Sequence, residues 1–123
     1  MSLDRLLADD GIRGQETSRM LGRGGLAEAM AGHVDPAAAL MKALSHPGRL
    51  LILCHLADGE KAVHELEALT GQRQAAVSQQ LARLRMEGLV TTRRAGKAIF
   101  YALRDSRVVP LLSCLPRLFD RVA

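Results

Sequence analysis

Aromatic residues, cysteine and long apolar runs are all scarce in this sequence. It has one Tyr, two Phe and no Trp, although 48% of its residues are hydrophobic. The core must therefore consist of Leu, Val, Ala, Ile and Met, and such a composition favours helices. Two cysteines are too few for a disulfide scaffold. No apolar stretch approaches the ~20 residues of a membrane span, and the N-terminus has no basic region followed by an apolar core, so we expect a cytoplasmic protein.

The motifs that mark common enzyme sites are missing as well. The sequence has no glycine-rich phosphate loop, no nucleophile elbow and no His-Glu metal motif. The stretch from Gly22 to Gly25 is too short to serve as a phosphate loop. We therefore expect no enzymatic activity, no catalytic residues and no cofactor.

Positive charge is concentrated in one part of the chain. The formal net charge is only +4, but six basic residues fall within 25 positions, between Arg73 and Lys97. The acidic residues from Asp58 to Glu67 lie just before this segment. A local basic excess suits an anionic partner such as nucleic acid.

Glycine and proline divide the chain into an arm and one domain. Residues 1–34 contain six of the eleven glycines and read as a flexible N-terminal arm with room for one short helix. Residues 35–123 form the predicted domain. Asp35 and Pro36 start a first helix that runs to about Ser45, with Asp35 as its N-cap. Pro47 then opens a second, almost wholly apolar helix that ends at Asp58 and Gly59.

Two further helices are separated by a tight turn. A short helix from Val63 stops at Thr70 and Gly71, and three residues later a fourth helix begins. Its apolar residues recur at helical spacing at Val77, Leu81 and Leu84. Two helices joined by a glycine-containing turn predict a helix-turn-helix.

The chain after Gly88 changes from helical to alternating periodicity. Apolar and polar residues alternate on both sides of Ala95-Gly96-Lys97, which predicts a β-hairpin. From Asp105 onward the apolar residues return to helical spacing, and we expect Pro110 and Pro116 to bend or interrupt this last helix. The expected fold is mainly α with a β-hairpin wing, a winged helix-turn-helix that forms a homodimer through its terminal helices.

The polar face of the fourth helix and the hairpin form the predicted DNA-binding surface. Gln and Arg side chains hydrogen-bond adenine and guanine edges in the major groove, and basic hairpin residues neutralise phosphates. The candidate residues are Arg73, Gln74, Ser78, Gln79 and Arg83 on the helix and Arg93, Arg94 and Lys97 on the hairpin. Each residue alone is more often a solvated helix former or part of a charged edge strand than a DNA contact. Their order along the chain favours double-stranded DNA, with a protein-interaction module as the alternative.

Over about residues 37–119 the chain resembles the ArsR/SmtB family of winged-helix repressors. The resemblance is carried by Ala43-Leu-Ser-His-Pro-Gly-Arg-Leu-Leu-Ile-Leu53, Val63-His-Glu-Leu66, Val77-Ser-Gln-Gln-Leu-Ala-Arg-Leu-Arg85, Gly88-Leu-Val90 and Ile99-Phe-Tyr-Ala-Leu103. It implies a homodimer that leaves its operator when an inducer binds. The two-fold symmetry of such a dimer predicts that the operator is an imperfect inverted repeat. The resemblance also implies that Ser78 and Gln79 read bases and that Arg93, Arg94 and Lys97 belong to the wing.

The resemblance also bears on the inducer. Metal-responsive members carry Cys-x-Cys in the third helix or Asp-x-His on the last helix. This chain has Ala62-Val-His-Glu-Leu66 and Asp105-Ser-Arg107 instead, so we expect no metal site there. Cys54 and Cys114 resemble the persulfide- and redox-responsive branch, which joins two thiols by a sulfur bridge. Cys114 departs from that pattern, because it lies about six residues, or ~9 Å along a helix, before the usual position near Asp120.

The cysteines therefore admit two interpretations. As sensors, Cys54 and Cys114 would release the repressor from DNA when a persulfide or oxidant modifies them, and Arg49 and His55 would lower the pKa of Cys54 if they point toward it. A disulfide would need Cα atoms within ~7 Å. As small apolar fillers, they would leave the response to a metal, a metalloid or another inducer.

Overall fold

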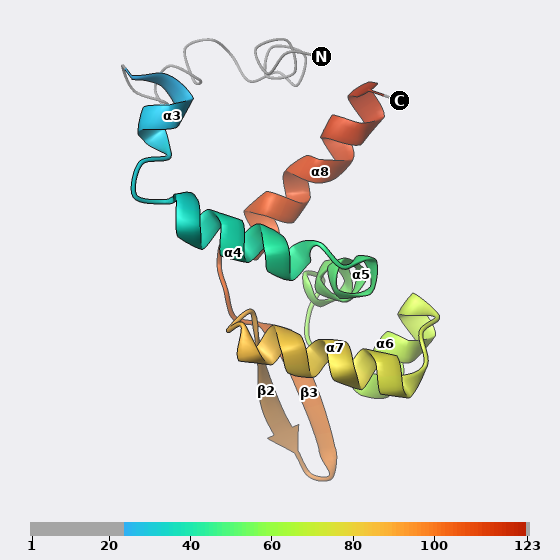
Figure 1. Ribbon diagram of the computed structural model, residues 1–123. Helices are drawn as coiled ribbons and strands as arrows, with labels where there is room; N and C mark the ends of the chain where they lie inside the picture. Colours follow the sequence, from blue (N-terminus) through green and yellow to red (C-terminus); the bar gives the residue numbers. More distant parts are fainter. Residues whose placement is uncertain (1–23, 123) are drawn as a thin grey trace. The chain divides into compact units, whose positions relative to one another are not determined.

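The structure is a computed structural model that describes residues 24–122 (Figure 1). The helices and strands, in chain order, are α3 (Gly25–Ala29), α4 (Val34–Leu44), α5 (Pro47–Leu56), β1 (Lys61–Ala62), α6 (Val63–Thr70), α7 (Gln74–Met86), β2 (Val90–Ala95), β3 (Ala98–Leu103) and α8 (Val108–Val122). No helix in this range is both long and apolar enough to span a bilayer. The predicted mainly α fold with a β-hairpin wing is confirmed.

The chain forms two compact units. One comprises residues 39–112 and contains the helix-turn-helix and the hairpin, and the other comprises, within the described range, residues 24–38 and 113–122. Of the predicted arm, residues 1–23 lie outside the described residues, and the remainder contains the five-residue helix α3. The assignment of residues 1–34 to a flexible arm stays a prediction.

The core of the larger unit is aliphatic, as the shortage of aromatic residues requires. Side chains from α5, α6, α7 and the segment that enters β2 are wholly or almost wholly buried in it: Ile52, Leu53, Leu56, Leu66, Val77, Leu81, Leu84, Leu89 and Val90. Each of the three helices buries one stripe and exposes the other, because residues three or four apart share a face.

Helix α5 begins at a side-chain cap. The His46 side chain lies just before Pro47, and its Nδ1 accepts a hydrogen bond of 3.1 Å from the backbone N–H of Gly48. A Cβ on Gly48 would lie 2.4 Å from Gln80 Nε2 and 2.7 Å from Gln72 Oε1. Glycine at this position therefore lets α5 approach α7 closely.

The turn between α6 and α7 is closed by Gly71. Gly71 has a φ of +74°, the left-handed conformation that glycine adopts without steric cost, and its N–H donates to the Glu67 carbonyl at 2.9 Å. Thr70 Oγ1 donates to the Leu66 carbonyl at 2.6 Å and accepts from the Gln72 N–H at 3.3 Å. These hydrogen bonds give partners to backbone carbonyls in the last turn of α6 and fix the turn that leads into α7. The predicted helix-turn-helix is thus formed.

The wing belongs to a three-stranded antiparallel sheet with strand order β1-β3-β2. In the hairpin, Thr92 lies opposite Tyr101 and Ala95 opposite Ala98, so that Gly96 and Lys97 form a two-residue turn. Strand β1, which pairs Lys61 with Tyr101, was not predicted. Two residues are too short to show a strand period, and their pairing depends on a segment about 40 positions away.

Two expectations about helix ends are wrong in detail. Helix α4 begins at Val34, because the Ala37 N–H already donates to the His33 carbonyl at 2.9 Å, and Asp35 lies in the first turn rather than at the cap. The predicted interruption of the last helix is wrong, because α8 continues through Pro116 to Val122, whereas a bend at either proline stays a prediction. Pro110 lies in the first turn, where an N–H has no intrahelical partner to lose.

Candidate nucleic-acid interface

Helix α7 has one apolar face and one polar face. Val77, Leu81 and Leu84 are completely buried against the rest of the larger unit. The predicted helix residues are all exposed, with Arg73 at the N-cap and four others along α7: Gln74, Ser78, Gln79 and Arg83. None of these five side chains is acidic, so this face can present hydrogen-bond donors and acceptors to an anionic partner.

Arg83 is the one residue of this polar face with an ion-pair partner in the described structure. Its Nε donates at 3.1 Å to Oε1 of Glu87, the C-cap residue of α7. Both side chains are solvent-exposed, and exposed pairs of this kind contribute little free energy. The guanidinium can therefore exchange Glu87 for a nucleic-acid acceptor at small cost.

Arg93 is held in place by two contacts within the protein. Its guanidinium forms two hydrogen bonds with the carboxylate of Glu60, one of them from Nε to Oε2 at 3.2 Å. The guanidinium carbon also lies 5.0 Å from the ring centroid of Phe100 on the paired strand. The hydrogen bond from Arg93 holds the pKa of Glu60 below its ordinary value. Sequence reasoning missed Glu60, which precedes β1 and meets Arg93 only because β1 joins the sheet.

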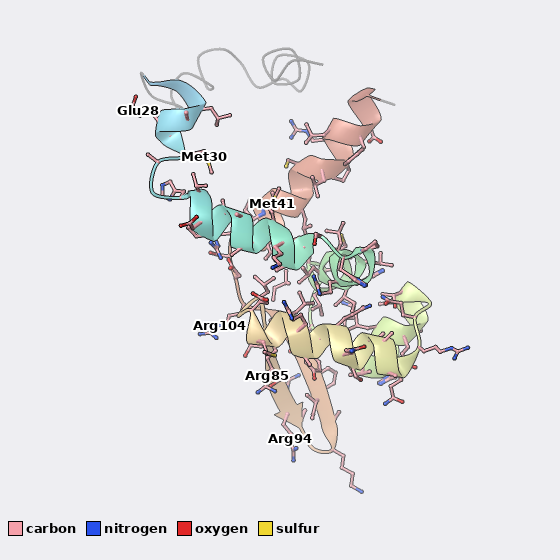
Figure 2. The ribbon with its side chains drawn as sticks, in the orientation of Figure 1. Glu28, Met30, Met41, Arg85, Arg94 and Arg104 are labelled. Carbon is pink, nitrogen blue, oxygen red and sulfur yellow. The ribbon has the colours of Figure 1, made fainter. Side chains whose placement is uncertain are left out.

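Arg94 and Lys97 present the remaining positive charge of the wing. Both side chains are exposed, and neither forms an ion pair within residues 24–122. Figure 2 shows Arg94 pointing away from the hairpin. The unpaired positive charge of the wing is therefore located at Arg94 and at Lys97 in the turn. The charge of Arg93, by contrast, is paired with Glu60.

The two cysteines are exposed thiols rather than a disulfide. Cys54 lies on the exposed face of α5, next to the buried Leu53, so it is not a filler of the subunit core. Partial burial and the nearby carboxylate of Asp58 raise the pKa of Cys54. Arg49 does not counteract this shift, because its guanidinium donates to the carbonyls of Ala43 and Lys42. The pKa of Cys54 is therefore raised, and not lowered as it would be if Arg49 and His55 pointed toward the thiol.

Asp105 and Arg107 form an ion pair just before α8. Asp105 Oδ1 accepts from both the backbone N–H and the Nε of Arg107 at 2.9 Å, and Oδ2 accepts from Nη2 at 2.5 Å. These hydrogen bonds lower the pKa of Asp105 to about 2. Both carboxylate oxygens of Asp105 thus accept hydrogen bonds from the Arg107 guanidinium, which competes with any metal ion for this carboxylate. No group of three or more His, Cys, Asp or Glu residues within the described range could hold a metal ion.

We expect the ion pair to make stability depend on pH in the acid range. A carboxylate whose pKa is about 2 in the folded state and about 4 in the unfolded state stabilises the fold above pH 4, and this contribution is lost as the pH falls toward 2. Arg107→Ala should raise the pKa of Asp105 toward the ordinary value and make the stability loss between pH 4 and pH 2 smaller. NMR titration of the Asp105 carboxyl in parent and variant measures the effect, and equal midpoints would refute it.

The comparisons with known proteins agree with this architecture. The family model described as bacterial regulatory protein, arsR family, matches residues 46–92, which extend from the N-cap of α5 into β2. The biofilm growth-associated repressor of Agrobacterium fabrum is 45% identical over 91 residues, which cover 74% of this chain and 78% of the relative. The transcriptional activator HlyU of Vibrio cholerae is 42% identical over 83 residues, which cover 68% of this chain and 77% of the relative.

Solved structures show the same fold. The crystal structure of the transcriptional repressor BigR from Xylella fastidiosa matches with a TM-score of 0.73 at 42% identity, covering 76% of this chain and 96% of that one. The homodimeric winged helix-turn-helix DNA-binding domain Mb0332 from Mycobacterium bovis matches with a TM-score of 0.62 at 33% identity, covering 78% of this chain and 89% of that one. The relatives are regulators rather than enzymes. This chain belongs to the ArsR family of bacterial regulatory proteins.

Proposed function

We propose that this protein is a transcriptional repressor that binds double-stranded DNA sequence-specifically. The observation that carries the proposal is the exposed, non-acidic face of α7 beside a wing whose turn carries unpaired positive charge. A major groove admits one helix, and Gln79 and Ser78 offer donors and acceptors to base edges there. Arg94 and Lys97 would neutralise phosphates or enter the neighbouring minor groove. The repressors among the relatives support the direction of regulation.

We also propose that the protein acts as a homodimer on an inverted-repeat operator. Helix α8 leaves large apolar side chains at the surface, with 65% of Phe119 exposed. Exposed apolar residues on one helix are typical of a protein interface. The homodimeric Mb0332 domain supports this assembly. A two-fold dimer places its recognition helices about one helical turn of DNA apart, ~34 Å, so the operator should be an imperfect inverted repeat.

The test is a selection of duplexes from a random pool, followed by affinity measurements over a range of salt concentrations. We expect an inverted repeat to be enriched and to bind at least ~10³-fold more tightly than random DNA. Each neutralised phosphate should contribute about −0.9 to the slope of log affinity against log salt. Equal and weak affinity for all duplexes, with little salt dependence, would instead support a winged-helix module that binds a protein partner.

We propose a thiol switch at Cys54 and Cys114 as the inducer response. Both side chains are accessible in the single subunit, which supports modification by a persulfide or an oxidant. The raised pKa of Cys54 leaves a smaller fraction as thiolate at neutral pH, so we expect its modification to accelerate as the pH rises toward 9. A cytoplasmic location stays a prediction.

The thiol switch predicts how cysteine variants respond to an organic persulfide. The sulfane sulfur passes to the Cys54 thiolate, the reagent leaves as its thiol, and the protein gains about 32 Da. Operator affinity should fall in the parent and not in Cys54→Ser, with Cys114→Ser as the matched variant. Intact mass and affinity are measured on the same sample. A normal response of both variants would mean that the cysteines are structural and that a metal, a metalloid or another molecule is the inducer.

A further inference from the structure

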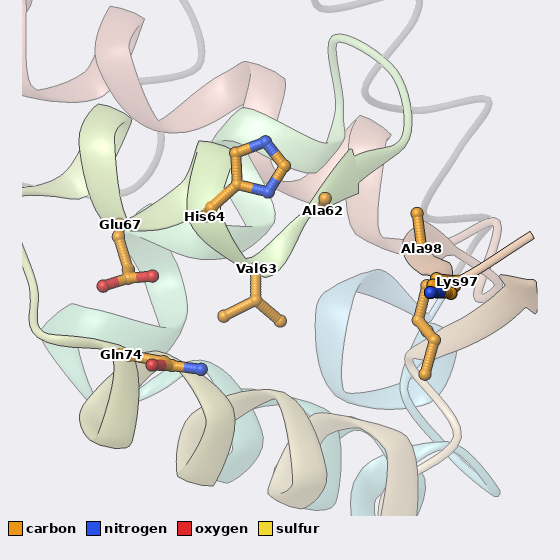
Figure 3. A pocket seen from close by; sticks show the side chains of 8 residues that line it. Ala62, Val63, His64, Glu67, Gln74, Lys97 and Ala98 are labelled. Carbon is orange, nitrogen blue, oxygen red and sulfur yellow. The ribbon is translucent and has the colours of Figure 1, made fainter. Parts of the chain in front are cut away.

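A cleft of about 400 Å³ opens between α6, the start of α7 and the turn of the hairpin. Figure 3 shows Glu67 and Gln74 at one end of the cleft and Lys97 at the other, with Val63 between the two ends. The side chain of His64 also lines the cleft. All of these residues belong to the larger unit, residues 39–112. Two of them, Gln74 and Lys97, are proposed DNA contacts from the helix and the wing, respectively.

We propose that this cleft holds a segment of the sugar-phosphate backbone of double-stranded DNA. The inference rests on the proposed function and extends it to residues outside the recognition helix and the wing. In duplex DNA one backbone strand separates each major groove from the neighbouring minor groove. If α7 lies in the first groove and the hairpin turn enters the second, that strand must pass between Gln74 and Lys97. The cleft is the space between these two residues.

The chemistry of the lining fits a backbone segment. Lys97 supplies an ammonium group and His64 an imidazole N–H, and both can donate to phosphate oxygens. Val63 and Ile99 supply apolar surface for a deoxyribose ring. The side chains of His64 and Lys97 are exposed, whereas a small-molecule site usually buries most of its ligand. An open cleft with donors at its rim therefore favours a continuous strand over a small inducer.

The two ends of the cleft carry opposite charges, because Glu67 lines one end and Lys97 the other. Glu67 is the only carboxylate in the lining. A phosphate should therefore sit toward Lys97 and away from Glu67. The carboxylate of Glu67 repels the negatively charged phosphates, so Glu67 weakens the binding of every duplex irrespective of its sequence. This effect separates the cleft from base reading, because removing the charge should change affinity without changing sequence preference.

The test compares four full-length variants on operator and random duplexes of equal length across a salt series. Glu67→Gln should tighten binding to both duplexes by about twofold to fivefold, and His64→Ala should weaken both by a similar factor. Lys97→Ala should reduce the salt slope by about 0.9. His33→Ala, an exposed histidine outside the cleft, is the matched control and should leave both affinities unchanged.

A second measurement locates the phosphate itself. Operator duplexes are prepared with one neutral methylphosphonate at each backbone position in turn. At the position held in the cleft, the difference between the parent and Glu67→Gln should disappear, and it should persist at all other positions. Thermal unfolding of each variant verifies that the exposed substitutions leave the fold intact.

The outcomes distinguish a wrong cleft assignment from a wrong function. Unchanged affinities of Glu67→Gln and His64→Ala, with sequence-selective binding by the parent, would overturn the cleft and leave the DNA-binding function standing. A changed response to inducer at unchanged DNA affinity would assign the cleft to a small molecule and also overturn the proposal. Absence of selective DNA binding by the parent would refute the proposed function itself.

Discussion

Leu53→Ala should lower the free energy of unfolding by about 2–5 kcal/mol, whereas Cys54→Ala, one position further along α5, should lower it by less than about 0.5 kcal/mol. Leu53 is completely buried, so truncation removes apolar contacts and leaves a cavity. Cys54 is exposed, so its truncation removes few contacts. The two substitutions probe opposite faces of the same helix under identical conditions.

Urea denaturation at one fixed protein concentration measures both effects, because dimerisation couples apparent stability to concentration. The dependence of free energy on urea should stay the same in all three proteins if only the native state is affected. A loss for Cys54→Ala as large as that for Leu53→Ala would contradict the exposed position. It would mean that Cys54 is packed in the assembled protein. The thiol would then be inaccessible to a persulfide or an oxidant, which would contradict its role as a sensor.

Gln79→Ala should weaken binding to the operator by about 1–3 kcal/mol, or roughly 5- to 150-fold, and leave binding to random DNA nearly unchanged. The reason is that a base contact contributes only where the matching base is present. Ser78→Ala should act in the same direction with a smaller effect, since a hydroxyl makes fewer directional bonds than an amide. Fluorescence anisotropy with the two duplexes gives both affinities.

Arg94→Ala serves as the contrasting variant. Arg94 is exposed on the wing, and a phosphate contact carries no sequence information, so operator and random DNA should lose affinity alike. The salt slope should become shallower by about 0.9 at the same time. If Gln79→Ala and Ser78→Ala also weaken both duplexes equally, the assignment of α7 to base reading is wrong.

The order of elements in this protein could be predicted from the sequence because the decisive signals are local. The period of Val77, Leu81 and Leu84 defines the buried stripe of α7, and thereby its exposed polar face. Gly71 marks the left-handed end of α6, and the two-residue break at Gly96 and Lys97 marks the hairpin turn. Each of these features depends on residues within about one or two helical turns of each other.

Tertiary structure decided which segments meet. The pairing of Glu60 with Arg93 joins residues 33 positions apart, and the cleft takes its lining from α6, α7, β1 and the hairpin. The two-residue strand β1 exists only because β3 is available as a partner. The local periodicity of the sequence does not predict such contacts. It shows which residues share one face of a helix or strand, but not which other segment packs against that face.

The same distinction explains the cysteines. The sequence places Cys54 in an apolar helix, which favours burial, but only packing determines which stripe of α5 faces the core. Leu53 is buried and Cys54 exposed because successive residues on a helix point about 100° apart. The Arg49 guanidinium is likewise directed to the Ala43 carbonyl, at 2.9 Å from Nε, by the way the chain turns between α4 and α5. The sequence by itself thus determined the elements and their polar and apolar faces, whereas long-range packing determined the neighbours of each side chain and the resulting ion pairs and pKa shifts.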